Sequence, residues 1–509
     1  MSEKYMPVLV GVGQVTEREF DVDSSSVLDL IEQAAYKAVE DAGISKASLA
    51  DLDSLVMVKS FRESTRNSPE ALANRIGATR ATQWLMPNGG NGPQYLVNRF
   101  SEAIANGESR FVLFAGAEAM ATARKIVKTT GEQPPWQEAA SGDPSFLVED
   151  VELSTPHEQQ HGLWLAPGFY AMSENARRHQ LGHSIEEHQL GLGDLFARFT
   201  EVAAKSPHAW YPVQRSSDEI ATATDSNRYV AWPYTKYMNA MNQINQSAAL
   251  LLTSVDQARK LGITEDKFIY LHGCSDTKEK SILGRQNYYS SEAMRVMAEQ
   301  VFENTGANGN LGIDNIEHID FYSCFPSAVA MARDTFGLSV DDPRPLTITG
   351  GLPFHGGAGN NYVMNSIAAM VEKVRADKGS YGLVTANGGY FSKHAAGIYS
   401  TNPVEGDWGR TNPASYQKGL DDAPDTPFTE SPNGEATIET YTVLYGRDNQ
   451  PQQGVVIGRL GELGDPKAER FVAMVDDDSD VLEGMTQQDM IGSKGIASSG
   501  DELNKFSLK

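Results

Sequence analysis

Apolar runs that end in glycine alternate with amphipathic stretches along the first part of the chain. Residues 7–13 and 110–116 are continuous apolar runs, which are typical of strands buried on both faces of a sheet. Residues 24–43 carry apolar side chains at spacings of three and four between serines and a glycine, so they predict a helix with both end signals. Residues 52–58 predict a further strand, and residues 68–77 predict a helix with proline in its first turn. This order predicts β–α–β units in a mostly parallel sheet.

The same order of elements returns about 265 residues later. A helix is predicted over residues 290–306, among strands predicted over residues 267–273, 316–322 and 381–389. The segments Gly90–Asn98 and Gly357–Asn365 also share the pattern G-x-G-x-x-Y-x-x-N, and each precedes a predicted helix and a buried strand. The shared pattern could also be a coincidence between two loops that each lead into a helix. Because order, spacing and motif agree, we predict a duplicated α/β fold with two packed sheets and helices between and outside them.

The rest of the chain divides by composition. Residues 120–241 are rich in Trp, His and Pro and too long for a simple connection, so they predict a subdomain inserted over one end of the sheets. Recurrent prolines predict an irregular linker, and later apolar runs separated by turn residues predict a small β-barrel with a loose end. The predicted units are residues 1–119 with 242–265, the insertion 120–241, a second half 266–402, a linker 403–435 and a β domain 436–509.

Charge and cysteine content narrow the possible functions. The 509 residues include 67 Asp and Glu against 43 Lys and Arg, a net charge of −24, which excludes general nucleic-acid or anionic-membrane binding as the main task. Only Cys274 and Cys324 occur, so a disulfide scaffold or a Cys-rich metal site is excluded. The start of the chain carries no signal-peptide core, and no apolar stretch is long enough to cross a bilayer. We therefore expect a cytoplasmic protein.

Four segments, in their order and spacing, resemble motifs of the thiolase superfamily. They are Gly89–Gly92 at the C-x-S-G position, Ala171–Ala176 in a loop-subdomain helix, Tyr322–Phe325 at the N-E-A-F or H-D-C-F position, and Gly350–Gly356 at the G-H-P loop. The resemblance covers residues 5–400 and implies two βαβαβαββ halves layered α-β-α-β-α. The linker and the extra β domain, with an OB-like barrel as one form of it, further resemble thiolase-like protein type 1.

The resemblance implies an acyl-CoA site, but the chain departs from the family at the decisive positions. The family's nucleophilic cysteine is replaced by Gly89, or by Gly90 if the register slips by one, and the second cysteine is lost from residues 386–389. The catalytic candidates that remain are His355, Cys324 and Tyr322, the last because steroid side-chain aldolases of this fold use tyrosine. The other candidates are Gly89, Gly90, Asn91, Asn387 and Gly388 around the nucleophile position, and Phe169, Met172 and Ser247 along a CoA tunnel.

Three functions are compatible with these residues. The first is an acyltransferase-class or retro-aldol-type enzyme that acts on C–C bonds of 3-oxo- or 3-hydroxyacyl-CoA thioesters in lipid metabolism. The second is a non-catalytic acyl-CoA-binding or scaffold protein whose β domain docks a protein partner. The third is a true thiolase with Cys324 as nucleophile. We expect a CoA ester as substrate or ligand, no covalent cofactor, no metal despite the histidine-rich insertion, and a homodimer or a monomer.

Overall fold

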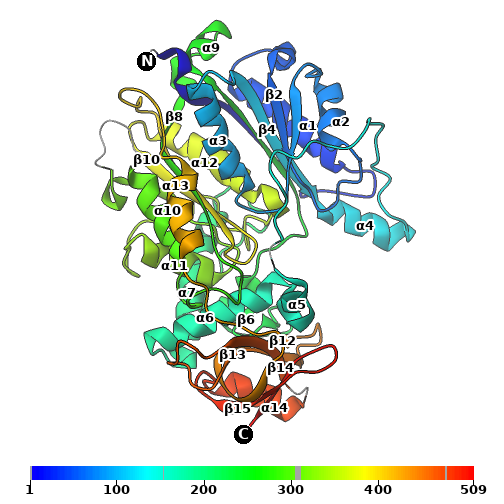
Figure 1. Ribbon diagram of the computed structural model, residues 1–509. Helices are drawn as coiled ribbons and strands as arrows, with labels where there is room; N and C mark the ends of the chain where they lie inside the picture. Colours follow the sequence, from blue (N-terminus) through cyan, green and yellow to red (C-terminus); the bar gives the residue numbers. More distant parts are fainter. Residues whose placement is uncertain (1–2, 153, 304–310, 476–477) are drawn as a thin grey trace.

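A nine-stranded sheet forms the main body of the molecule (Figure 1). The computed structural model describes residues 3–152, 154–303, 311–475 and 478–509. The strands of the main sheet are β1 (Pro7–Thr16), β2 (Ser54–Val58), β3 (Thr82–Met86), β4 (Phe111–Ala119), β7 (Asn245–Ser254), β8 (Ile269–Lys278), β9 (His318–Asp320), β10 (Tyr381–Gly388) and β11 (Lys393–Ser400). The predicted α/β class is confirmed. The expectation of two mostly parallel sheets is wrong in its details, because β1 pairs with β8 to join the halves into one sheet and most of the pairings are antiparallel.

The strand order confirms the duplication. One half runs β3-β2-β4-β7-β1 and the other runs β9-β10-β11-β8, so the same order recurs without a counterpart of β3 among the described strands. The pairings also recur, because β2–β4 and β9–β10 are parallel whereas the next two pairings in each half are antiparallel. At the missing position, the Phe321 amide donates to the Leu346 carbonyl at 3.0 Å, so an irregular segment lies along β9.

Helices cover and join the two halves. The helices α3 (Gly92–Ala105) and α12 (Tyr362–Ala376) contact each other and strands of both halves, so they form the central layer. The remaining helices of the main body are α1 (Val27–Asp41), α2 (Ser68–Ile76), α4 (Met120–Thr130), α9 (Val255–Lys260), α10 (Glu292–Glu303) and α11 (Pro326–Thr335). The helix predicted over residues 290–306 corresponds to α10, and its last three predicted residues lie outside the described part of the chain.

A segment of the insertion covers the free edge of the sheet at β3. We call residues 136–149 the edge strap. The Leu85 amide donates to the Ser145 carbonyl at 2.9 Å, and the Leu147 amide donates to the Leu85 carbonyl at 3.0 Å. Ion pairs from Arg66 to Asp143 and from Arg75 to Glu138 hold the strap against α2. Because an unpaired edge strand is a template for pairing with another chain, the strap blocks that route here.

The C-terminal strands close into a five-stranded barrel. The strands β12 (Asn433–Tyr445), β13 (Pro451–Leu460), β14 (Arg470–Val475), β15 (Lys494–Ser498) and β16 (Lys505–Leu508) pair in the cycle β12-β13-β14-β16-β15, and α14 (Ser479–Gln487) packs on this barrel. The chain end was expected to be loose, but β16 pairs with both β14 and β15. The segment expected to be an irregular linker contains α13 (Pro413–Asp422), because a proline at the first helical position is compatible with a helix.

The barrel is bound firmly to the rest of the molecule. The insertion supplies α5 (Pro156–Glu158), α6 (Ala166–Leu181), α7 (Ile185–Ala203), α8 (Ser217–Ala221), β5 (Tyr229–Ala231) and β6 (Tyr234–Thr235), and β5 pairs with β12. The fully buried Arg470 donates to Glu439 Oε1 at 2.6 Å and to the Leu283 carbonyl at 2.8 Å. Glu439 belongs to the barrel itself, so the contact that Arg470 makes across the domain boundary is its hydrogen bond to the Leu283 carbonyl.

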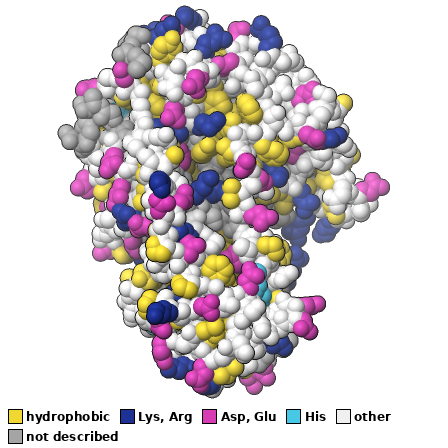
Figure 2. All heavy atoms as spheres, viewed as in Figure 1, with side chains coloured by type: hydrophobic (Ala, Val, Ile, Leu, Met, Phe, Trp, Pro, Cys, Tyr) yellow, Lys and Arg dark blue, Asp and Glu magenta, His cyan; other side chains and the backbone are white. Residues whose placement is uncertain are grey.

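The surface agrees with the acidic composition. Figure 2 shows acidic side chains spread over the whole visible face, including the barrel end, with basic side chains interspersed. Within the described residues, no helix has the length and apolar character needed to cross a membrane.

Candidate functional site

The predicted nucleophile position lies in a tight turn where the two central helices begin. Gly89 and Gly90 follow β3 and precede α3, and Gly89 adopts a φ of 145°, which favours glycine. The Gly89 amide donates to Asn360 Oδ1 at 2.9 Å, and Asn360 lies just before α12. Asn360 Nδ2 in turn donates to the Lys59 carbonyl at 2.8 Å. The turn is therefore fixed between the two halves of the fold.

The space beside Gly90 is filled by Tyr322. A Cβ atom at Gly90 would lie 2.4 Å from Tyr322 Oη and 2.6 Å from the Asn387 carbonyl, so no side chain fits without movement. Tyr322 and Asn387 border a cavity of only about 10 Å³, about the smallest that holds a single water molecule. At Gly90, one of the two positions where the family resemblance places a nucleophilic sulfur, a tyrosine hydroxyl thus lies against the glycine backbone.

Neither thiol has the character of a nucleophile. Cys324 is buried four residues after β9 ends, and burial raises its pKa to about 12. Cys274 is buried in β8, and burial likewise raises its pKa to about 12. Because the thiolate is the reactive form of cysteine, both side chains are unreactive near neutral pH. Burial also raises the pKa of Tyr322 well above its ordinary value, so its hydroxyl is a proton donor.

A hydrogen-bonded network extends from this turn into the insertion. Asn387 Nδ2 donates to Tyr170 Oη at 2.8 Å, and Tyr170 Oη donates to the Gly389 carbonyl at 2.9 Å. The Asn91 side chain lies against two glycines of the site, because a Cβ at Gly388 would lie 2.4 Å from its Oδ1. Among the described residues, Oδ1 of Asn91 and Oδ1 of Asn387 are buried without a hydrogen-bond partner. Unpaired acceptors of this kind are costly and point to a ligand or an ordered water.

Lys393 reaches the same turn from the other side. Its Nζ donates to the Asn88 carbonyl at 3.0 Å, and its Cδ lies 3.7 Å from the Cβ position of Gly89. Burial lowers the pKa of Lys393, the nearby Asp150 opposes that shift, and the nearby Lys278 adds to it. Sequence reasoning missed both Lys393 and Tyr170. A lysine four residues after the glycine-rich segment 386–389 was the available signal for Lys393.

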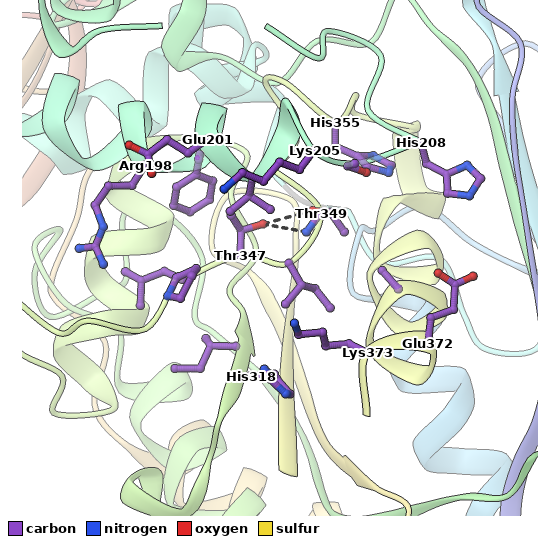
Figure 3. Close-up of a pocket in the computed structure, with 18 of the residues that line it drawn as sticks. Arg198, Glu201, Lys205, His208, His318, Thr347, Thr349, His355, Glu372 and Lys373 are labelled. Atoms are coloured by element: carbon purple, nitrogen blue, oxygen red, sulfur yellow. Dashed lines mark hydrogen bonds between the residues drawn. The ribbon is translucent and has the colours of Figure 1, made fainter. Parts of the chain in front are cut away.

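His355 lies in a different place from the rest of the predicted catalytic set. It lines a cavity of about 830 Å³ together with His208 (Figure 3). The His355 and Tyr322 rings both pack edge-on against Tyr362, at centroid distances of 5.7 and 5.9 Å. No hydrogen bond joins His355 to Tyr322 or Cys324 in the described part of the chain. Burial, with smaller contributions from the charges of His208 and Arg18, lowers the pKa of His355 to about 4, so its imidazole is neutral.

The predicted CoA-tunnel residues are also separated. Phe169 and Met172 are fully buried on α6, and the Phe169 ring packs among other aromatic rings, including that of Phe391. Ser247 lies in β7, where its hydroxyl donates to the Leu30 carbonyl at 2.7 Å. The structure therefore brings Tyr322, Asn387, Asn91 and the glycines together, but leaves His355 and Ser247 elsewhere. The described residues hold no cluster of three side chains that could bind a metal ion.

Comparisons with known proteins agree on the fold. Residues 415–501 match the family described as "Thiolase-like protein type 1 additional C-terminal domain". The chain is 38% identical to the monomeric SCP2-thiolase-like protein type 1 from Mycobacterium smegmatis, with 100% of both chains covered and a TM-score of 0.86. Comparison with curated proteins gives no match.

Two more distant structures share the fold of the main body. The "Ltp2-ChsH2(DUF35) aldolase" is 18% identical with a TM-score of 0.59, over 78% of this chain and 98% of that one. The human mitochondrial 3-ketoacyl-CoA thiolase in complex with CoA is 16% identical with a TM-score of 0.53, over 78% of this chain and 99% of that one.

Proposed function

Because this chain belongs to the SCP2-thiolase-like protein type 1 family, we propose that it acts on coenzyme A thioesters without attaching the acyl group to a cysteine. The observation that carries this proposal is the contact between Tyr322 Oη and Gly90. A glycine cannot hold an acyl group, and both thiols are buried with a pKa of about 12. The shared fold with a human thiolase described in complex with CoA supports the class of ligand.

Proton transfer is the chemistry that the residues at the turn permit. The Tyr322 hydroxyl stays protonated, because burial raises its pKa, so it holds a proton that a stronger base such as an enolate carbon can take. The pKa of Lys393 is lowered, so more of its amine is neutral and can accept a proton. With a 3-hydroxyacyl-CoA, Lys393 would take the hydroxyl proton and the C2–C3 bond would break into a carbonyl product and a thioester enolate. Tyr322 would protonate C2, and the proton on Lys393 would return to the phenolate. The fold shared with a protein described as an aldolase supports this reaction class.

Binding without turnover is the second candidate. It is favoured by two buried acceptors at the turn that have no hydrogen-bond partner among the described residues. The unpaired oxygens of Asn91 and Asn387 would then accept hydrogen bonds from the ligand or from a bound water. In this case the barrel on α6 serves as a docking platform for a protein partner.

Mass spectrometry and turnover distinguish the candidates. The intact protein is incubated with acetoacetyl-CoA and with 3-hydroxyacyl-CoA thioesters, and both the protein mass and the released products are measured. We expect no acetyl adduct and release of acetyl-CoA from the 3-hydroxy substrates, which is lost in Tyr322→Phe and Lys393→Met. Tyr95→Phe is the matched control, because Tyr95 is a half-buried tyrosine of α3. An adduct on Cys324 would refute the proposal, and tight binding without products would establish the second candidate.

A further inference from the structure

A second cavity lies at the sheet edge opposite the edge strap. Its volume is about 830 Å³, within the range of small-molecule sites. The end of α7, the segment 343–349, the start of β9 and the second half of α12 form its walls (Figure 3). This is the edge where the second half has no counterpart of β3, so an irregular segment leaves space that a strand would fill.

One wall of this cavity is apolar. It is formed by Leu195, Phe199, Val202, Ile319, Leu346, Ile348 and Ala369. Phe199 and Ile319 are buried, whereas Val202 and Ile348 are half-buried and available to a ligand. Covering such a wall with hydrocarbon is favourable by about 25 cal/mol per Å² of apolar surface removed from water. The cavity therefore suits a ligand with a hydrocarbon body.

Two lysines reach over the cavity from opposite walls. Figure 3 shows Lys205 extending from above and Lys373 from below. Neither forms an ion pair within the described residues. Arg198 also lines the cavity, and its Nη2 donates to the Asp342 carbonyl at 2.7 Å, which fixes it at the wall.

The charges that line the cavity are balanced in number but separated in place. Its cations are Arg198, Lys205 and Lys373, and its carboxylates are Glu201, Glu317 and Glu372. Figure 3 shows Glu372 beside His208, away from Lys205. The pKa values of His208 and His355 are lowered to about 4, so both rings are neutral. Because neither lysine has an ion-pair partner within the described residues, a ligand with one negative charge can pair with them.

We propose that this cavity binds an amphipathic monocarboxylate, with its carboxylate between Lys205 and Lys373 and its hydrocarbon body against Val202 and Ile348. This ligand site is separate from the turn at Gly89 and does not depend on chemistry there. A carboxylate between two ammonium groups is held by charge-assisted hydrogen bonds, and an apolar wall adds affinity without selecting the head group. Recognition of the head group and of the body can therefore be tested independently.

Calorimetric titration of the full chain with octanoate and octan-1-ol tests this proposal. We expect octanoate to bind at least tenfold more tightly than octanol, and Lys205→Gln with Lys373→Gln to remove that preference while leaving octanol binding unchanged. Lys128→Gln is the control, because Lys128 is an exposed lysine of α4.

Two further results decide the outcome. Val202→Phe places a ring in the cavity, so it should weaken both ligands, with circular dichroism as the check on folding. Absence of octanoate binding at millimolar concentration, equal affinity for octanol, or an equal loss in Lys128→Gln would each overturn the proposal.

Discussion

Replacing Gly90 with alanine tests whether the turn is glycine for steric reasons. The added Cβ would lie 2.4 Å from Tyr322 Oη and 2.6 Å from the Asn387 carbonyl. The tyrosine can rotate slightly, but the carbonyl belongs to β10 and is held by the sheet. Overpacking of this kind costs typically about 1–3 kcal/mol. The loss of backbone freedom in the unfolded chain returns about 0.4–1 kcal/mol, so we expect a net loss of roughly 1–2 kcal/mol.

The measurement is the urea midpoint and the thermal midpoint of unfolding, with Gly92→Ala as control. Gly92 starts α3, and its added Cβ would meet only the flexible Met86 side chain, at 3.2 Å. We expect this control to be neutral or slightly stabilising, because alanine is the better helix former by about 1 kcal/mol. Adding Tyr322→Phe to Gly90→Ala should recover part of the loss, since the closest of the three contacts, at the Tyr322 hydroxyl, disappears while the ring carbon Cζ at 2.9 Å stays. Equal stability of Gly90→Ala and Gly92→Ala would refute the steric explanation.

Three further predictions concern other parts of the molecule. If Lys393 is the proton acceptor, Asp150→Asn should lower the pKa of Lys393, so the reaction rate should rise at lower pH. Lys278→Gln should raise that pKa, so the rate should rise at higher pH. Shifts in the same direction for both variants would contradict the role of Lys393. Burial raises the pKa of Glu118 from 4.5 to about 7, so folding takes up a proton between these pH values and stability falls as pH rises from the first to the second. Glu118→Gln should flatten this dependence of the thermal midpoint on pH, and an unchanged slope would refute the assignment. Leu147→Pro removes an amide that ties the edge strap to the sheet, and light scattering should then show a larger molecular mass than for the unsubstituted chain, whereas an unchanged mass would show that the strap is not needed.

Part of the candidate site was readable from local sequence. Two short motifs, each only a few residues long, marked Gly89 and Gly90 in one place and Tyr322 in another as candidate site residues. The structure brings Gly90 and Tyr322 into contact. The pairing of Lys393 with this turn could not be read in the same way. It depends on β11 lying beside β10 and on a lysine side chain reaching the Asn88 carbonyl across about 300 residues of chain.

The alternation of apolar runs and amphipathic stretches determined the duplicated α/β architecture, because a strand buried on both faces and a helix buried on one face have different periodicities. Only the tertiary structure decided which side chains meet. His355 occupies the expected glycine-rich loop. Its carbonyl accepts hydrogen bonds from the Trp210 amide and from the Gln246 side chain, and its ring lines the large cavity. A motif sets the residue and its neighbours in sequence, whereas the direction of its side chain is set by long-range packing.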